Sequence, residues 1–211
     1  MKTYTVLDFE TTGLDPKEER ITQIGAIKIT IEGNVFLPTS NVSSVTSFET
    51  LVNPEKQIPE IITELTGIDN EKVKNSPTES EAILKLVEFL GEDSIIVAQN
   101  APFDLGFLHH ATLRAGEVPN VYNFYCTRTM SAVFYPSISH RLVDMCTFFD
   151  INLTNAHDAS NDAKATLELF SKLSSIANSH SVNFLNKLVH HPDRKMNFEP
   201  TNKIIIPLQK R

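Results

Sequence analysis

Cysteine is scarce in this sequence, and no long hydrophobic run is present. The two cysteines, Cys126 and Cys146, form no CxxC pair and have no histidine at zinc-ligand spacing. We therefore expect two buried free thiols in a reducing compartment, which favours the cytoplasm. No stretch approaches the roughly 18 consecutive apolar residues of a membrane span. Residues 1–5 lead directly into a predicted strand, so we expect neither a signal peptide nor a membrane protein.

Basic residues are also in the minority. Lysine and arginine number 19 against 26 aspartates and glutamates, which gives a formal net charge of −7. A protein that binds nucleic acid non-specifically usually carries a basic face, so this balance argues against such a protein. Acids gathered around a metal ion would explain part of the excess. Any contact with phosphate would then depend on metal ions and a few local cations.

The 211 residues, 41% of them hydrophobic, are enough for one domain with a sizeable core and some appendage. Residues 3–9, 21–31 and 47–52 predict an antiparallel meander of strands. Helical patterns and short apolar runs follow. They predict helices over 59–65, 78–90, 102–115, 127–134, 140–149 and 161–178, and strands over 94–98 and 121–126. This order indicates an α/β domain of three layers, a mixed central sheet flanked by helices.

The first predicted strand ends in two acids, Asp8 and Glu10. Side chains alternate between faces along a strand, so these two carboxylates project from the same face. Carboxylates this close in a partly dry site repel, and one would normally take up a proton. A divalent cation between them removes the conflict and keeps both ionised. The strand end is therefore a candidate metal site, at an edge of the sheet where ligands gather.

Two later segments place further acids near the ends of predicted elements. Asp104 falls in the first turn of the helix that follows the apolar run 95–98, although the helix dipole alone also favours an acid there. Asp158 and Asp162 lie around the start of the last long helix. Asp158 competes with Asp162 for a metal-ligand role, but it could equally be the helix N-cap. His157, in the preceding loop, either overhangs the same pocket or is a solvated loop residue.

Three motifs combine these acids in order: Asp8-Phe9-Glu10-Thr11-Thr12-Gly13-Leu14, Asn100-Ala101-Pro102-Phe103-Asp104, and His157-Asp158-Ala159-Ser160-Asn161-Asp162-Ala163. They resemble the motifs of the DnaQ-like 3′-to-5′ exonucleases of the DEDD group, in its histidine-containing subclass. Within this group the sequence is most similar to the proofreading exonucleases of bacterial replicative polymerases. One departure is Gln99, where many members have histidine. The resemblance implies a ribonuclease H-like fold, with the exonuclease domain over residues 1–178.

The resemblance also implies the chemistry. Two Mg²⁺ ions about 3.5–4 Å apart would support in-line hydrolysis of a phosphodiester, and Mn²⁺ would substitute for them. By the match to the family's motifs, Asp8 is implied to bridge both ions. Glu10 and Asp162 are implied to be the further ligands of the ion that holds the attacking water. Asp104 holds the second ion through water. His157 is the implied general base, because an imidazole with an unperturbed pKa of about 6.5 suits hydroxide formation near neutral pH.

The resemblance further locates the substrate. The turn after the first strand lies beside the acids, where the family binds the 3′ end through backbone N–H groups. The residue at Leu14 is implied to pack on terminal bases, and Asn100 is a candidate contact to phosphate. Phe103 either stacks on a base, worth about 1–3 kcal/mol, or is a core residue at the helix start. The substrate-binding candidates are Thr11, Thr12, Gly13, Leu14, Asn100 and Phe103.

The leading hypothesis is a metal-dependent 3′-to-5′ exonuclease that converts single-stranded or frayed DNA ends into nucleoside 5′-monophosphates. It would serve proofreading or repair, either free-standing or beside a DNA polymerase subunit. An exoribonuclease of the same family is the nearest alternative, because the motifs do not decide whether a 2′-hydroxyl is admitted. A non-catalytic nucleic-acid-binding module is a third reading, which the five intact catalytic residues disfavour. The motifs give no oligomeric state.

The resemblance fades after residue 178, and we expect residues 179–211 to form a C-terminal extension. Residues 187–211 hold six lysines and arginines and two acids, a local charge of +4 by difference. We favour a strand or arm packed on the body of the domain. The alternative is a docking segment for a polymerase, another subunit or nucleic acid.

Overall fold

The computed structural model describes residues 1–33, 37, 40–189 and 196–207. Of the expected C-terminal extension, residues 190–195 and 208–211 lie outside this description. Among the described residues, no helix is both long enough and apolar enough to cross a membrane.

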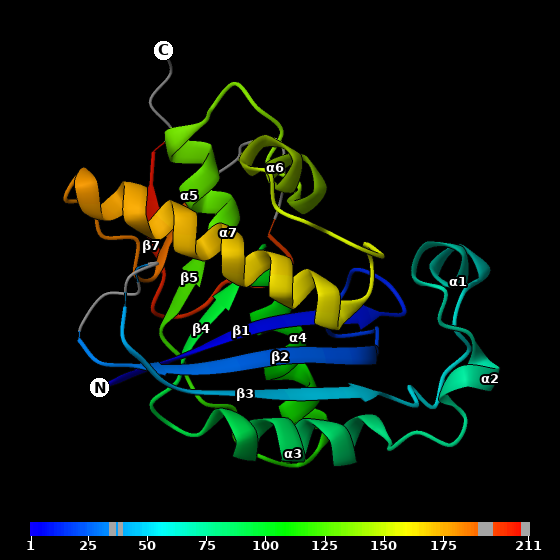
Figure 1. Ribbon diagram of the computed structural model, residues 1–211. Coiled ribbons are helices and arrows are strands. Elements are labelled where there is room, and N and C mark those ends of the chain that lie inside the picture. Colours follow the sequence, from blue (N-terminus) through cyan, green and yellow to red (C-terminus); the bar gives the residue numbers. More distant parts are fainter. Residues whose placement is uncertain (34–36, 38–39, 190–195, 208–211) are drawn as a thin grey trace.

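A five-stranded sheet forms the centre of the molecule (Figure 1), in the strand order β3-β2-β1-β4-β5. The strands β1, β2 and β3 pair antiparallel, as the meander predicted, whereas β4 and β5 run parallel to β1. The mixed sheet expected from the sequence is therefore confirmed. The strands are β1 (Lys2–Thr11), β2 (Ile21–Ile31), β3 (Val42–Leu51), β4 (Ile95–Ala98) and β5 (Phe124–Cys126).

Helices cover both faces of this sheet, which confirms the three-layer α/β class. Figure 1 shows α5, α6 and α7 over one face and α3 and α4 over the other, with the short α1 and α2 beyond one end of β3. The helices are α1 (Glu60–Thr66), α2 (Asn70–Val73), α3 (Glu79–Leu90), α4 (Ala101–Arg114), α5 (Thr127–Phe134), α6 (Leu142–Phe149) and α7 (Ala159–Ser179).

Strand β1 joins the two halves of the core because its side chains alternate between the faces. Tyr4 and Val6 pack into the apolar cluster beneath α5, α6 and α7. Leu7 and Phe9 pack into the other cluster, against α3 and α4. By the same alternation, the acids that follow on β1 fall on the α7 face of the sheet.

Some boundaries differ from the sequence prediction for physical reasons. Strand β3 begins at Val42 rather than at residue 47, because residues 42–47 are exposed and backbone pairing with β2 alone defines their strand. The short α2 was not predicted, and Asp69 caps it by accepting a hydrogen bond from the Lys72 N–H. Strand β5 begins only at Phe124, since Val121 is 67% exposed.

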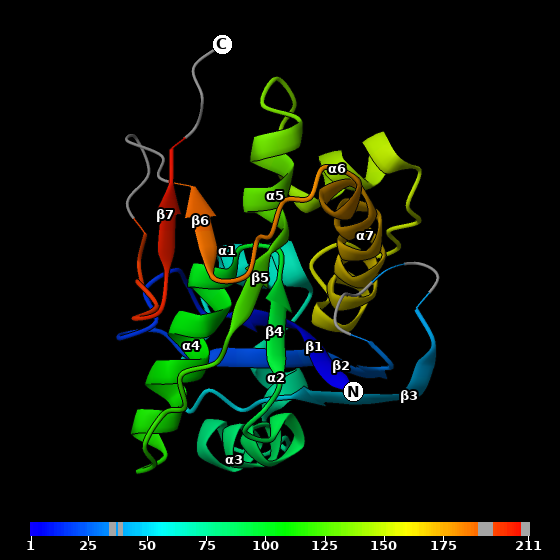
Figure 2. The same ribbon diagram turned by 90° about the vertical axis from the view of Figure 1, so that its left-hand side faces the viewer.

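The segment after α7 returns to the body of the domain. Strands β6 (Lys187–Val189) and β7 (Ile204–Ile206) form a separate parallel pair, seen in orange and red in Figure 2. Asn186 connects this pair to β5, because its N–H donates to the Phe124 carbonyl (2.8 Å) and its side-chain oxygen accepts from the Phe124 N–H (2.8 Å). Leu188 is buried in the core cluster that includes residues of α3 and α4.

Candidate active site

The carboxyl end of β1 carries Asp8 and Glu10. Both side chains lie on the α7 face; Asp8 is partly buried and Glu10 is 9% exposed. Across the antiparallel pair, Asp8 faces Gly25 and Glu10 faces Gln23 on β2. The register shifts immediately after Glu10, so the chain leaves the sheet directly beside these acids.

Helix α4 brings the third acid to the same place. It follows β4 with Asn100 at the N-cap position and Pro102 within its first turn, where the missing N–H of proline costs nothing. Asp104, in that first turn, is only 3% exposed. Its carboxylate accepts hydrogen bonds from its own backbone and from that of Phe9 on β1. The acid therefore points back to the strand that carries the first two.

The start of α7 supplies the remaining candidates. Asp158 is the helix N-cap: its Oδ1 accepts from the Asn161 N–H at 3.0 Å, as the sequence allowed. Asp162 lies one turn into the helix, and its Oδ2 accepts from the backbone N–H of His157 at 3.3 Å. His157 is exposed and has φ +68°, a left-handed conformation that histidine seldom adopts.

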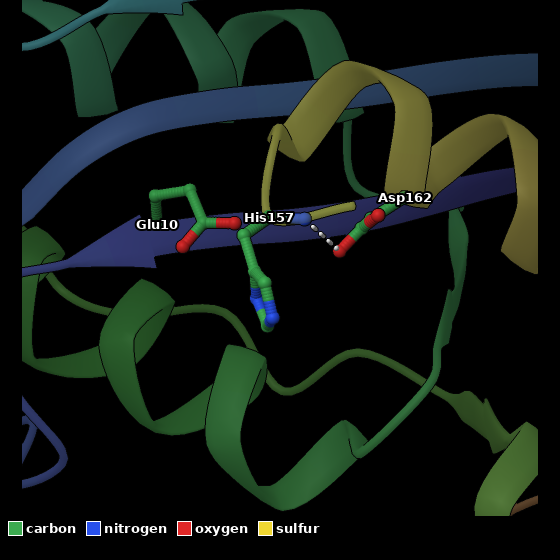
Figure 3. Close-up of side chains that lie close together, drawn as sticks. All are labelled: Glu10, His157 and Asp162. Atoms are coloured by element: carbon green, nitrogen blue, oxygen red, sulfur yellow. Dashed lines mark hydrogen bonds between the residues drawn. The ribbon is translucent and has the colours of Figure 1, made fainter. Parts of the chain in front are cut away.

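Glu10, His157 and Asp162 converge from β1, the loop before α7 and α7 itself. One potential ligand atom of each lies within 4.8 Å of those of the other two. Figure 3 shows the two carboxylates on either side of the histidine side chain, with the backbone of His157 bonded to Asp162. Two acids and an imidazole within this distance could hold a metal ion or move a proton.

The acids also interact electrostatically. Burial, with repulsion from nearby acids of α7, raises the pKa of Glu10 from 4.5 to about 8. Burial and repulsion from Asp104 and Asp162 raise the pKa of Asp8 well above its ordinary value. Burial likewise raises the pKa of Asp104, although its backbone hydrogen bonds oppose the shift. Burial also raises the pKa of Asp162, although the hydrogen bond from the His157 N–H opposes the shift. Four carboxylates thus share one poorly solvated region.

These residues fit a divalent cation. In the part of the chain that the structure describes, Asp162 Oδ1 is buried and has no hydrogen-bond partner, a costly arrangement for a carboxylate oxygen. A cation would bond this oxygen and offset the burial and the repulsion that raise the carboxylate pKa values. The carboxylate oxygens are hard ligands of the kind that Mg²⁺ and Mn²⁺ accept. The site can therefore hold a divalent metal.

Two residues of β2, Gln23 and Gly25, position α7, and neither was predicted. The side chain of Gln23 is buried; its Nε2 donates to Asp158 Oδ2 (3.0 Å) and its Oε1 accepts from the Ala159 N–H (3.1 Å). A Cβ on Gly25 would overlap the Ala159 carbonyl and lie 2.6 Å from the Ser160 nitrogen. A glycine inside an alternating strand was the available signal for this close approach.

The turn after β1 contains the predicted contacts to the substrate. Thr11 Oγ1 donates to the Gly13 carbonyl (2.7 Å), and the Thr12 N–H donates to the Arg20 carbonyl (2.8 Å). Both threonines are buried, so their hydroxyls serve the turn itself; that of Thr12 donates to Glu19. Leu14, in contrast, is 72% exposed. The turn therefore exposes one apolar side chain a few residues after Glu10.

The two candidates on α4 have different surroundings. Phe103 is partly buried against the core, and its ring centroid lies 4.9 Å from that of Phe107. It retains some exposed surface, so packing and base stacking are both compatible with its position. Asn100 is partly exposed, and its side chain makes no capping bond to α4. Gln99, the departure from the family pattern, donates to the His140 carbonyl (2.7 Å) and ties β4 to the loop before α6.

Comparisons with known proteins agree with this arrangement. The family model RNase_T, described as "Exonuclease", matches residues 5–170. The chain is 37% identical over 172 residues to the "DNA polymerase III PolC-type" of Caldanaerobacter subterraneus subsp. tengcongensis, covering 81% of this chain and 11% of that protein. It is 33% identical over 189 residues to the corresponding protein of Bacillus subtilis, covering 89% of this chain and 12% of that protein. The chain thus spans about one eighth or less of these relatives.

Solved structures show the same fold. The crystal structure of Escherichia coli Exonuclease I in complex with a dT13 oligonucleotide superposes with a TM-score of 0.73 and 18% identity, covering 86% of this chain and 43% of that one. A zinc-bound form of the same protein with single-stranded DNA superposes with a TM-score of 0.69 and 19% identity, covering 85% of this chain and 43% of that one. At this level of identity the likeness concerns the fold alone.

Proposed function

Because the chain belongs to the RNase_T exonuclease family, we propose that it is a metal-dependent 3′-to-5′ exonuclease acting on single-stranded or frayed DNA ends. The products are nucleoside 5′-monophosphates. One observation carries this proposal: Glu10, His157 and Asp162, from three separate segments, bring potential ligand atoms within 4.8 Å of one another. Asp104, Glu10 and Asp162 all repel the carboxylate of Asp8, which supports placing the four acids in the same site.

The four acids serve as the metal-binding set. Asp8, Glu10, Asp104 and Asp162 would hold two Mg²⁺ ions, with Mn²⁺ as a substitute. When bound, such ions stabilise the attacking and leaving oxygens of the phosphodiester. Burial of Glu10 and Asp104 excludes competing water, which strengthens the attraction of these carboxylates for a cation. The unpartnered oxygen of Asp162 is supporting evidence for its role.

His157 acts as the general base. Its side chain is exposed, while its backbone is fixed by the bond to Asp162. An exposed imidazole next to the acids can accept the proton of an attacking water and pass it to solvent. This arrangement explains why the loop residue is held so near the start of α7.

DNA is the proposed substrate because the similar proteins named above include DNA polymerases, and a structural neighbour is complexed with a DNA oligonucleotide. The turn at residues 11–13 offers backbone groups to the 3′-terminal nucleotide, and the exposed Leu14 packs on its base. Asn100 contacts phosphate, and Phe103 contributes a stacking surface. A DNA polymerase is the proposed partner, with proofreading or repair as the role. The cytoplasm is the proposed location, since the two cysteines are free and buried.

Digestion of an end-labelled oligonucleotide tests this proposal. A single-stranded DNA that is labelled at its 5′ end and incubated with excess Mg²⁺ should give a ladder of products that shorten from the 3′ end. A chelator should abolish this ladder. Asp8→Asn should reduce the rate by orders of magnitude while the protein stays folded by circular dichroism. Digestion of a matched RNA oligomer in preference to the DNA would indicate an exoribonuclease. Intact DNA at every Mg²⁺ or Mn²⁺ concentration would contradict the proposal.

A further inference from the structure

Residues 196–206, here named the C-terminal arm, reach the turn that follows β1. The side chain of Asn197 donates a hydrogen bond from Nδ2 to the carbonyl oxygen of Leu14, with a distance of 2.8 Å. Figure 2 shows the orange-to-red arm beside this blue turn. The two residues are 183 positions apart, and Asn197 lies outside the segment that the family model matches. The contact therefore lies outside the segment on which the family match rests.

A tight junction next to Asn197 fixes the arm in place. A Cβ on Gly106 of α4 would lie 2.7 Å from the Cβ of Phe198 and 3.2 Å from Pro16 Cγ, so only a glycine lets the three segments meet. The Phe198 ring also packs on His109, with centroids 5.1 Å apart. The arm, α4 and the turn after β1 thus meet at one point.

The arm is anchored separately at its far end. Asn202 Nδ2 donates to the Tyr122 carbonyl (3.0 Å), and the Ile204 N–H donates to the Asn186 carbonyl (2.7 Å). These bonds connect the arm to the β5 and β6 region, away from the turn. Loss of the Asn197 bond alone would therefore leave the arm attached, so the effect of that bond can be measured by itself.

We propose that the C-terminal arm positions the 3′-terminal nucleotide, because Asn197 fixes the backbone of Leu14 and so the direction of its exposed side chain. The Leu14 side chain is 72% exposed, and it follows Glu10 by four residues in the turn after β1. An apolar side chain on a loose turn loses conformational freedom when it packs on a base, which weakens binding. A turn held by the arm has already lost that freedom. This inference rests on the proposed exonuclease function.

Steady-state kinetics on a single-stranded DNA oligomer with Mg²⁺ tests the proposal. Asn197→Ala should raise KM roughly 2- to 10-fold, the effect of losing one hydrogen bond, while kcat stays unchanged. Asn202→Ala is the matched control, because it removes an arm bond of the same type away from the turn. Its KM should equal that of the wild type. Equal KM values for Asn197→Ala and Asn202→Ala would overturn the proposal.

A double-mutant cycle identifies the route of the effect. If Asn197 acts through Leu14, the variant that combines Asn197→Ala with Leu14→Ala should have the KM of Leu14→Ala alone. If the separate effects of the two substitutions on KM multiply in the double variant, the assignment to Leu14 is overturned. Melting temperatures of all variants exclude unfolding as the cause. A wild-type chain that leaves DNA intact would instead refute the proposed function, so the two failures are distinguishable.

Discussion

His157 combines an exposed imidazole with a backbone at φ +68°, and its N–H donates to Asp162. A backbone conformation this uncommon persists only where its surroundings enforce it. His157→Ala removes the imidazole but not the backbone bond. We expect kcat to fall about 10²- to 10⁴-fold, the usual contribution of a general base, while Mg²⁺ still raises the melting temperature. His180→Ala is the control, and near-full activity of His157→Ala would refute its role.

Glu10 gives the site a defined pH dependence. Its pKa rises from 4.5 to about 8, first through burial and then through Asp162 and Asp158. Between these two values the folded chain retains a proton that the unfolded chain has released. Raising the pH through this window therefore lowers the free energy of unfolding of the metal-free protein. Asp8 and Asp104, whose pKa values are also raised, act in the same direction.

We expect the melting temperature of the metal-free protein to fall between pH 4.5 and about pH 8, the two pKa values of Glu10. Excess Mg²⁺ should restore more stability at the higher pH, because the cation binds the deprotonated acids. Glu10→Gln cannot ionise, so its melting temperature should fall less steeply with pH. Thermal melts with and without Mg²⁺ measure both effects. Parallel pH curves for Glu10→Gln and the wild type would contradict the assignment.

Among the elements, β2 determines where α7 begins. Gly25→Ala would place a methyl group against the backbone of Ala159 and Ser160, so the helix start must move away from the sheet. Because Asp162 and His157 move with it, we expect kcat to fall about 10²-fold, the cost of a misplacement of about 1 Å. Thr30→Ala, at the opposite end of the same strand, should retain activity. Wild-type kcat for Gly25→Ala would show that the helix start tolerates the methyl group.

For the whole molecule, the extension after α7 is part of the core. Phe184 is 1% exposed and belongs to the cluster beneath α7, and Leu188 belongs to the cluster on the other face. A chain that ends at residue 178 exposes both clusters. We expect its melting temperature to fall by roughly 10 °C, since loss of one buried phenylalanine costs about 3–5 kcal/mol. Equal melting of the shorter chain would show that residues 1–178 fold independently.

Local patterns in the sequence determined the order and type of most elements and the identity of the acids. Alternation along β1 put Asp8 and Glu10 on one face, and the apolar run of β4 followed by Pro102 defined the start of α4. These features depend on neighbouring residues, so they can be inferred without a fold. The division of the chain between residues 178 and 179 and the roles of the individual site residues stay predictions.

Only the tertiary structure decided which distant residues meet. The pairing of Asp8 with Gly25 follows from strand register, and the bond from Asn197 to Leu14 joins the two ends of the chain. Asp158, the N-cap of α7, also accepts a hydrogen bond from Gln23, which comes from a strand far away in the sequence. Such contacts join groups that are far apart in the chain. Their energies depend on packing in three dimensions, which no local pattern of residues encodes.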